Sequence, residues 1–377
     1  MRGVKHSANN PDVVVVGAGI AGAYAAFYLA KAGLRTLVIE RAGVAQQASR
    51  WNPGGLNPLH GPSIPGTLSD FSLRSFKLHM YNAETLSENQ GDYGLRLAPR
   101  IQLALNERQE KGLATAMQPY QDNTGFSARH MERSELQRLE PAIAPEVLAG
   151  AQLHGNYSVN THHYADALLR AACAEGARLV TDEVLGIRQN GSRVESVILS
   201  SSTQVAGAVI FATGPWVTGP AKWLNTLIPI TAVKGQLLRL PRSPVSTGFD
   251  LTNGLTGLYH QTDGSVLIGG TEEAGGLACR TDKAGKSLIL SGLARLVRPA
   301  HQLDVTGHYA AVRPVSADQL PIIGRVPGWD NAYLLTGGGR KGVLYSSGMG
   351  YAISHELATG KSWPAAVACN PARFSNI

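Results

Sequence analysis

Three glycines near the N-terminus have the spacing of a dinucleotide-binding loop. The run Gly17-Ala-Gly-Ile-Ala-Gly22 follows a β-branched stretch, Asp12–Val16, and leads into an alanine-rich segment, Ile20–Ala32. In such a strand–loop–helix unit the first glycine permits a sharp turn, the second lets the backbone approach a pyrophosphate, and the third lets helix and strand pack closely. The helix N-terminus adds unpaired N–H groups and a positive dipole end. The pattern therefore predicts a dinucleotide site.

An acidic residue at the end of the next expected strand completes this motif. Glu40 closes the run Arg35–Glu40, and its carboxylate can accept hydrogen bonds from both ribose hydroxyls. It would repel a 2′-phosphate, so NADP is disfavoured. The sequence has a single glycine motif that leads on to an acidic strand end, whereas enzymes that reduce a flavin with NAD(P)H usually carry a second nucleotide site. The sequence therefore favours electrons that come from a small substrate.

Sequence signatures of other chemistries are missing. The sequence contains no G-x-x-x-x-G-K-[ST], G-x-S-x-G or H-E-x-x-H motif. His162-His163 has no acidic or cysteine companion at ligand spacing, so we interpret the pair as the start of a helix and expect no metal site. The three cysteines, none at C-x-x-C spacing, argue against a disulfide framework and indicate a reducing compartment.

The composition is typical of a folded protein with two domains. The 377 residues are 44% hydrophobic and 16% charged, which allows a large core. The net charge of +7 is scattered, without a run of five basic residues. This distribution argues against a nucleic-acid partner and favours anionic ligands. The start Met1–Pro11 is polar and the apolar run Val13–Val16 is too short for a membrane span, so we expect a cytoplasmic protein.

The order of strand-like and helix-like segments predicts an α/β fold in which one domain interrupts another. Helices are expected at Thr67–Asn89, Tyr164–Glu175, Lys286–Arg298 and Val343–Leu357. Strands are expected within residues 183–212 and 228–273, with a hairpin turn at Asn190-Gly191. We assign to the nucleotide-binding domain residues 1–85, 150–228 and 308–377, and to a strand-rich second domain residues 86–149 and 229–307.

Further segments resemble those of a known family. They are Ala48–Leu56, Phe211–Trp216, Val233–Gln236, Gly264–Thr271, Val312–Pro314, Asp318–Gly324 and Gly339–Leu344. Together with the spacing from Gly17 to Glu40, they resemble the FAD-dependent D-amino-acid oxidase superfamily, and within it glycine oxidase and its relatives. The resemblance implies a Rossmann-like FAD-binding domain of the GR2 type. This domain would be interrupted by a mostly antiparallel β-sheet substrate domain with helices.

The same resemblance implies a reaction. The protein would oxidise the C–N bond of glycine, a D-amino acid or a secondary amine by hydride transfer to flavin N5. The resulting imine would hydrolyse, and O2 would accept the electrons and give H2O2. No acid–base residue is assigned, because the amine reacts in its neutral form, which is populated as the pH rises.

By position, the resemblance assigns a set of residues to FAD. They are Gly17, Gly19, Ile20, Ala21 and Gly22 for the pyrophosphate; Glu40, Arg41 and Val184 for adenosine; Ser49, Gly54, Gly55, Leu56, Gly342, Val343 and Leu344 for the flavin; and Gly214 of Phe211–Trp216. The last flavin residues open a helix, whose positive end can stabilise negative charge on reduced flavin. The stretch Tyr309–Gly324 lacks the cysteine through which sarcosine oxidases tether flavin, so we expect non-covalent FAD.

Four residues are assigned to the substrate. The resemblance places Tyr259, Arg313 and Arg340 there. Arg313 would pair bidentately with a carboxylate, and Tyr259 would add a hydroxyl hydrogen bond. Trp51 and Glu272 depart from the glycine oxidase pattern, the first by its bulk and the second by its charge. We hypothesise that Glu272 faces the pocket and tunes selectivity toward a cationic group.

Three other functions remain open on the sequence alone. The first is an amino-acid or amine dehydrogenase that passes electrons to a quinone or a partner protein. The second is a tRNA-modification flavoprotein, because the superfamily includes such a domain and the chain is basic. The third is a flavin-binding subunit of a larger amine dehydrogenase complex. A homo-oligomer is equally left open, as is the identity of the substrate.

Overall fold

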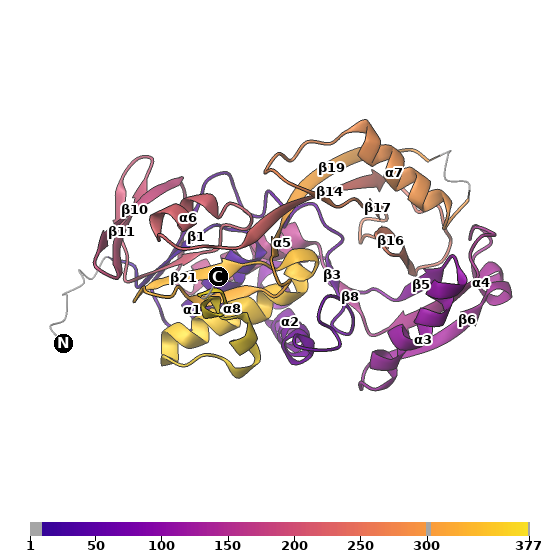
Figure 1. The fold of residues 1–377 in the computed structure, drawn as a ribbon, viewed down its shortest axis with the longest axis horizontal. Helices are drawn as coiled ribbons and strands as arrows, with labels where there is room; N and C mark the ends of the chain where they lie inside the picture. The colour runs from indigo at the N-terminus through magenta and orange to yellow at the C-terminus, as the bar shows by residue number, and fades with distance from the viewer. Residues whose placement is uncertain (1–9, 299–302, 376–377) are drawn as a thin grey trace.

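A six-stranded sheet organises one half of the molecule (Figure 1). The computed structural model describes residues 10–298 and 303–375, so the expectation for the polar N-terminal residues 1–9 lies outside the described residues. Five of the strands run parallel, and β20 is antiparallel to β21. In spatial order the strands are β20 (Ile322–Arg325), β21 (Ala332–Thr336), β13 (Ala208–Phe211), β1 (Val13–Val16), β2 (Thr36–Glu40) and β9 (Arg178–Thr181).

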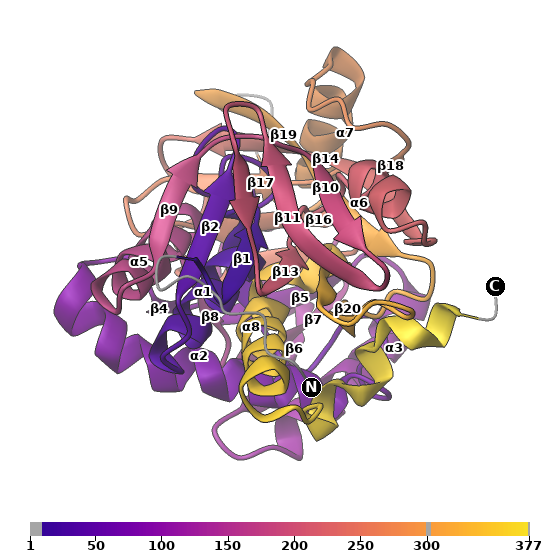
Figure 2. The same ribbon diagram turned by 90° about the vertical axis from the view of Figure 1, so that its left-hand side faces the viewer.

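The central strand β1 is buried on both faces, which explains its unbroken run of valines. Val13 and Val15 belong to a core shared with helices, whereas Val14 belongs to a core on the opposite face. One face carries α1 (Ile20–Lys31), α5 (Thr161–Ala174), α8 (Gly342–Thr359) and, outside them, α2 (Ser69–Gln90). The other face carries the meander β10 (Val184–Asn190), β11 (Arg193–Leu199) and β12 (Thr203–Val205), with α6 (Thr218–Trp223), as Figure 2 shows.

Helices α1 and α8 approach each other closely. A Cβ atom on Gly350 of α8 would lie 2.6 Å from the carbonyl carbon of Tyr24 in α1, so only glycine fits this crossing. Tyr24 is fully buried there. The contact therefore fixes α8 against α1, and with it the position of the α8 N-terminus.

A second, nine-stranded sheet forms the other half of the molecule. All its neighbouring strands are antiparallel except β15 and β5. In spatial order they are β18 (Glu273–Ala274), β14 (Ile230–Leu240), β17 (Val266–Gly269), β16 (Thr256–His260), β15 (Asp250–Asn253), β5 (Arg100–Ala104), β7 (Ala149–His154) and β6 (Ser127–Glu132), with β19 (Gly307–Ser316) paired to β14. The helices of this half are α3 (Glu107–Gln121), α4 (Arg133–Leu139) and α7 (Lys283–Ala294).

Short elements connect the two halves and close the chain. A small sheet joins β3 (Gly55–Leu56), β8 (Tyr157–Ser158) and β4 (Arg96–Leu97). The 3-10 helices are η2 (Gly339–Lys341), directly before α8, and η3 (Pro364–Cys369) and η4 (Pro371–Phe374) near the end of the chain. Among the described residues, no helix is long and apolar enough to cross a membrane. No group of three or more His, Cys, Asp and Glu side chains within these residues could hold a metal ion.

The predicted α/β class, with a parallel sheet and a mostly antiparallel second sheet, is confirmed. Helix α7 begins three residues earlier than expected, because Asp282 caps it by accepting a hydrogen bond from the Gly285 amide. The predicted domain boundaries would place β7 and β19 with the nucleotide-binding domain, yet both strands pair within the nine-stranded sheet. We therefore propose boundaries after residues 154 and 316 instead of 149 and 307.

The α1–α8 crossing generates a stability prediction. Gly350→Ala should lower the free energy of unfolding by about 1–3 kcal/mol, because the added methyl group overlaps the backbone of Tyr24. Gly112→Ala is the matched control. Gly112 lies at an exposed position of α3 with no atom near the added Cβ, so the change should be neutral or stabilising by up to about 1 kcal/mol. Urea unfolding of the two variants decides: equal midpoints would contradict the assigned crossing.

Candidate functional site

A cavity of about 1040 Å³ lies between the two sheets. It is lined by the β1–α1 loop, the segment 43–62, the start of β10, strands β16 and β19, and the η2–α8 junction. Most of the predicted site residues line it, namely Gly17, Gly19, Ile20, Ala21, Glu40, Arg41, Ser49, Gly54, Gly55, Val184, Gly214, Tyr259, Arg313, Arg340, Gly342 and Val343. Gly22, Leu56, Glu272 and Leu344 lie just outside the lining.

The nucleotide end is built on the β1–α1 loop. Gly17 has φ +107°, and a Cβ there would lie 2.6 Å from the carbonyl oxygen of Ala212. A Cβ on Gly22 would overlap the Gly17 carbonyl oxygen, so this glycine serves helix–strand packing. The α1 N-terminus has no cap from its own Gly19, but the Ile20 amide donates to Ser49 Oγ at 3.0 Å.

Glu40 and Arg41 form the part of the cavity wall at which we expect adenosine. The Glu40 carboxylate accepts hydrogen bonds from the amides of Ala18, at 2.8 Å, and Ala42, at 3.0 Å. It thus orders the glycine loop and keeps lone pairs for another donor. The guanidinium of Arg41 lies 4.8 Å from the ring centre of Trp216, which also lines the cavity. An adenosine group would have a carboxylate and a flat aromatic surface beside it.

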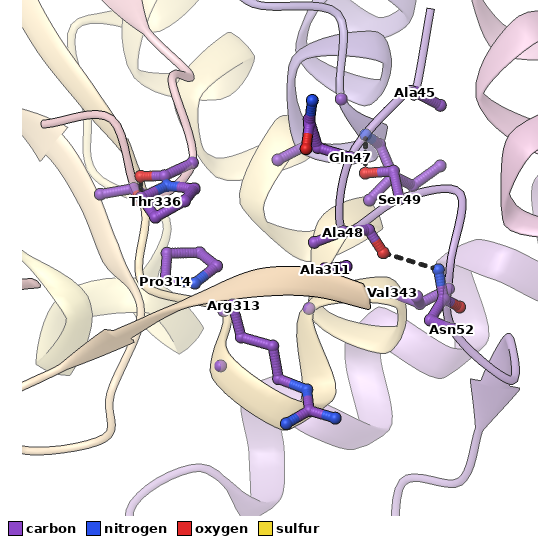
Figure 3. A pocket seen from close by; sticks show the side chains of 18 of the residues that line it. Ala45, Gln47, Ala48, Ser49, Asn52, Ala311, Arg313, Pro314, Thr336 and Val343 are labelled. Carbon is purple, nitrogen blue, oxygen red and sulfur yellow. Dashed lines mark hydrogen bonds between the residues drawn. The ribbon is translucent and has the colours of Figure 1, made fainter. Parts of the chain in front are cut away.

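The segment 43–62 is ordered by a side chain that the sequence analysis did not single out. Asn52 Oδ1 accepts hydrogen bonds from the Gly54 amide and from Thr161 Oγ1, both at 2.8 Å. Its Nδ2 donates to the Ala48 carbonyl at 2.8 Å. Figure 3 shows Asn52 and Ser49 on one side of the cavity, with Arg313 projecting from β19 on another. The sequence signal that could have identified Asn52 is its type, because asparagine is common in turns, and its place directly before Pro53.

The N-terminus of α8 meets the same cavity. Gly342 and Val343 line it, and no side chain caps the helix. Leu344 is fully buried in the core, so only its backbone can serve the predicted role. No side-chain cap therefore blocks the start of α8, and the helix dipole adds positive potential there.

A buried histidine holds this helix start in place. His79 Nε2 lies 3.1 Å and 2.9 Å from the carbonyl oxygens of Val343 and Leu344. Because both are acceptors, Nε2 carries the proton and Nδ1 accepts from the hydroxyl of Tyr24 or Tyr164. Burial lowers the pKa of His79 to about 4, although its hydrogen bonds to the backbone oppose this. The imidazole is neutral at pH 7.

The part of the cavity around Arg313, here called the substrate end, is where we expect the substrate to bind. The Arg313 guanidinium donates to the Thr271 carbonyl at 3.3 Å, and 26% of its side chain is exposed. A Cβ on Gly235 of the paired strand β14 would lie 2.5 Å from this guanidinium, so glycine makes room for it. Burial lowers the pKa of Arg313, and the nearby Glu272 carboxylate counteracts this shift. A charged donor group therefore remains directed at the cavity.

Glu272 lies next to both substrate arginines. Its Oε1 is 3.6 Å from Nη1 of Arg313 and 3.4 Å from Nε of Arg340. These distances are long for charge-assisted hydrogen bonds, so the pairs are loose. The Glu272 carboxylate already has two protein cations beside it. The hypothesis that Glu272 tunes selectivity toward a cationic substrate group therefore stays a prediction.

Three basic residues in the cavity wall were missed by sequence reasoning: Arg100, Lys341 and His60. Lys341 Nζ donates to the carbonyl and Oδ1 of Asn57. Burial, reinforced by Arg100 and Arg340, lowers the pKa of Lys341 well below its ordinary value. Burial and these neighbouring charges likewise lower the pKa of His60. An arginine within the apolar strand Arg100–Ala104 was the signal that could have identified this group.

Trp51 links the two halves of the molecule at the cavity rim. Its ring stacks on Tyr309 of β19, with centroids 3.7 Å apart and planes 7° from parallel. The guanidinium of Arg50 lies 5.1 Å from the centroid of the Trp51 ring. The bulk that distinguishes this position from the glycine oxidase pattern therefore closes the wall between the segment 43–62 and β19.

The residues present fit FAD. The cavity joins a glycine loop that a Cβ would fill, a carboxylate at the adenosine end, and two helix N-termini without caps of their own. Uncapped helix N-termini are suited to a pyrophosphate and to an electron-rich flavin edge. The cavity continues to Arg313 and Tyr259, so a small acid would lie beyond the cofactor within one space.

Comparisons with known proteins agree with this geometry. The family model for FAD-dependent oxidoreductases (DAO) matches residues 12–356. Over 340 residues the chain is 29% identical to a glycine oxidase of Geobacillus kaustophilus, covering 89% of each chain. Over 404 residues it is 25% identical to a D-amino acid dehydrogenase of Neisseria meningitidis, covering 93% of this chain and 96% of the relative. The crystal structure of the G. kaustophilus glycine oxidase superposes with a TM-score of 0.89 at 26% identity, covering 97% and 99% of the chains.

His79 generates a prediction about acid stability. Its folded pKa of about 4 lies below the ordinary 6.5, so the folded state binds fewer protons between these values. The lowered pKa of His79 contributes up to about 3 kcal/mol to the free energy of unfolding. This contribution is complete above pH 6.5 and is lost as the pH falls toward 4. His79→Gln, which keeps an N–H donor and does not titrate, should lose less stability between pH 6.5 and 4.5. His163→Gln, at an exposed position of α5, should behave as the unmodified protein in urea unfolding at both pH values. Equal pH dependence in all three proteins would contradict the assignment.

Proposed function

The chain belongs to the family of FAD-dependent oxidoreductases, and on this premise we propose that it oxidises the C–N bond of a small amino acid or amine bearing a carboxylate. The observation that carries the proposal is Arg313, a largely buried guanidinium in the cavity that also contains the dinucleotide loop. A buried arginine suits a carboxylate because its planar fork donates two parallel hydrogen bonds. The glycine oxidase and D-amino acid dehydrogenase relatives, as their names state, act on such compounds.

The proposed chemistry needs little from the side chains. FAD, held by the glycine loop, Glu40 and the α8 N-terminus, supplies a hydride acceptor at flavin N5 when bound. Arg313 holds the carboxylate, and the Tyr259 hydroxyl adds a hydrogen bond. These contacts orient the C–H bond of the carbon that bears the nitrogen. The α8 N-terminus presents uncapped amides to negative charge that develops nearby.

The charges in the cavity wall favour a neutral amine. Arg100, Arg313 and Arg340 surround the substrate end, and the acidic residues that line the cavity lie at the nucleotide end. Nearby positive charges lower the pKa of a bound amine and promote loss of its proton to water. No side chain needs to act as a general base. The imine product hydrolyses in solution.

The electron acceptor is the point on which two functions differ. We propose O2, with H2O2 as product, by analogy with the glycine oxidase relative. The D-amino acid dehydrogenase relative favours a second candidate, a dehydrogenase that uses a quinone or a partner protein. The yield of peroxide under air, per mole of substrate oxidised, distinguishes them.

Loss of flavin absorbance without oxygen tests the proposal. The holoprotein is mixed anaerobically with glycine, sarcosine, D-alanine and their decarboxylated counterparts methylamine, dimethylamine and ethylamine. We expect bleaching by at least one acid and not by its counterpart. Arg313→Gln should lower kcat/KM for that acid by about 30-fold or more, because a charge-assisted contact in a buried site is lost.

Arg239→Gln is the control for Arg313. Arg239 lies on β14 of the same sheet but pairs with Asp263 at the surface, so its variant should keep normal efficiency. Equal bleaching by the acids and their counterparts, or an Arg313→Gln enzyme of normal efficiency, would refute the carboxylate role.

Glu272 should compete with the substrate for the arginines. Its carboxylate lies near both Arg313 and Arg340. Glu272→Gln keeps the shape and removes the charge, so KM for a carboxylate substrate should fall about 3- to 10-fold with kcat little changed. Glu273→Gln is the matched control, because Glu273 pairs with Lys234 on β14 instead. Steady-state kinetics of both variants measure the effect, and an unchanged or higher KM in Glu272→Gln would contradict it.

A further inference from the structure

Arg100 is a buried arginine whose guanidinium has no hydrogen-bond or ion-pair partner among the described residues. It lies at the start of β5, lines the cavity, and is 8% exposed. Among the described residues, no side chain or carbonyl forms a hydrogen bond or an ion pair with its guanidinium, and its Nε is buried without a partner. The carboxylate of Asp250, its neighbour in register, is taken by Arg96 and by the His260 amide. A buried cation without a counter-charge is costly, so its retention requires an explanation.

The surroundings of Arg100 make the missing partner an anion. Its guanidinium lies 5.8 Å from the ring centre of Tyr259, and Gly55 is within 4.0 Å of it when extended by a Cβ. Its positive charge helps to lower the pKa values of Lys341 and His60. The acidic residues in the cavity lining are Glu40, Asp182 and Glu183, all at the nucleotide end. Among the described residues that line the cavity, none therefore brings negative charge to Arg100 at the substrate end, whereas a bound ligand can.

The charge count of the substrate end is consistent with a doubly anionic ligand. Arg313 and Arg340 share one carboxylate, that of Glu272. Arg100 shares none. Three guanidinium groups and one carboxylate leave two positive charges, with Lys341 left out because burial lowers the pKa of its amine well below the ordinary value. One of them is used by the carboxylate that the proposed function assigns to Arg313.

We propose that Arg100 binds a second carboxylate of the substrate, so that the protein acts on a dicarboxylic amino or imino acid. This inference rests on the proposed function, since it takes the first carboxylate to be held by Arg313. Tyr259, whose ring lies near Arg100 and whose hydroxyl is assigned to the substrate, stands close to both anionic groups. The second carboxylate is a specificity determinant and takes no part in the hydride transfer.

Non-reacting probes test the inference apart from turnover. Succinate and glutarate are titrated into the FAD-loaded protein and compared with their monoamides, succinamate and glutaramate, through the shift of the flavin absorption bands. The pairs differ only in the second carboxylate. We expect at least one diacid to bind about tenfold or more tightly than its monoamide. Equal affinities for both acid–amide pairs would overturn the inference.

Variants of Arg100 test whether this residue causes the tighter binding of the diacid. In Arg100→Gln the diacid and its monoamide should bind with nearly equal affinity, and Arg100→Lys should restore part of the difference. Arg129→Gln, an exposed arginine on β6 of the same sheet that pairs with Glu135, should retain it fully. A diacid preference that persists in Arg100→Gln would overturn the assignment. Should Arg100→Gln not fold, the lysine variant and the unmodified protein still decide.

Acetate separates this inference from the proposed function. As a monocarboxylate it occupies the Arg313 subsite first, so its binding should weaken about tenfold or more in Arg313→Gln and clearly less in Arg100→Gln. If acetate binding depends on Arg313 but the diacids bind no more tightly than their monoamides, the assignment of a second carboxylate to Arg100 is wrong and the proposed function stands. If acetate binding ignores Arg313, the proposed carboxylate role itself fails.

Discussion

The close approach of backbone segments at glycine is the constraint on which the cavity depends. The contact of Gly22 with the Gly17 carbonyl places the start of α1 directly at the end of β1. The contact of Gly350 with Tyr24 then fixes α8 on α1. Two helix N-termini consequently open into one cavity, at the edge of a sheet whose central strand is buried on both faces. Since a helix N-terminus lacks intrahelical partners for its first amides and carries a positive dipole end, this packing creates an anion-binding frame before any charged side chain contributes.

The charged side chains divide the cavity into two ends of opposite character. At the nucleotide end, Glu40 uses backbone amides to order the glycine loop and leaves acceptor capacity for the ribose. At the substrate end, Arg313 and Arg340 share Glu272, while no side chain in the described part of the chain supplies a counter-charge to Arg100. Guanidinium groups keep their charge when buried more readily than amines do, because their ordinary pKa is so high. The arginines can therefore hold anions at a depth where Lys341 tends toward the neutral form.

Neutral buried groups give the cavity its rigidity. His79 connects the carbonyls that begin α8 to the hydroxyls of Tyr24 and Tyr164, and it does so as an uncharged imidazole. Asn52 holds the turn at Gly54 in the same manner, through neutral hydrogen bonds alone. Such contacts cost little on burial when every donor finds an acceptor. They position the cofactor-binding backbone without adding charge that would compete with a ligand.

The local pattern of the sequence determined the βαβ unit, because a valine run, a glycine loop and an acidic strand end are all read over about 30 adjacent residues. The α/β class and family followed from motifs in chain order, and Arg313 from its place in one of them. Only the tertiary structure decided which distant charges meet. Glu272 joins Arg313 and Arg340 because β19 pairs with β14 and η2 precedes α8, and Arg100 comes to the cavity wall through a parallel pairing of β5 with β15. Burial and pairing of charges depend on contacts between distant segments, which no local spacing encodes.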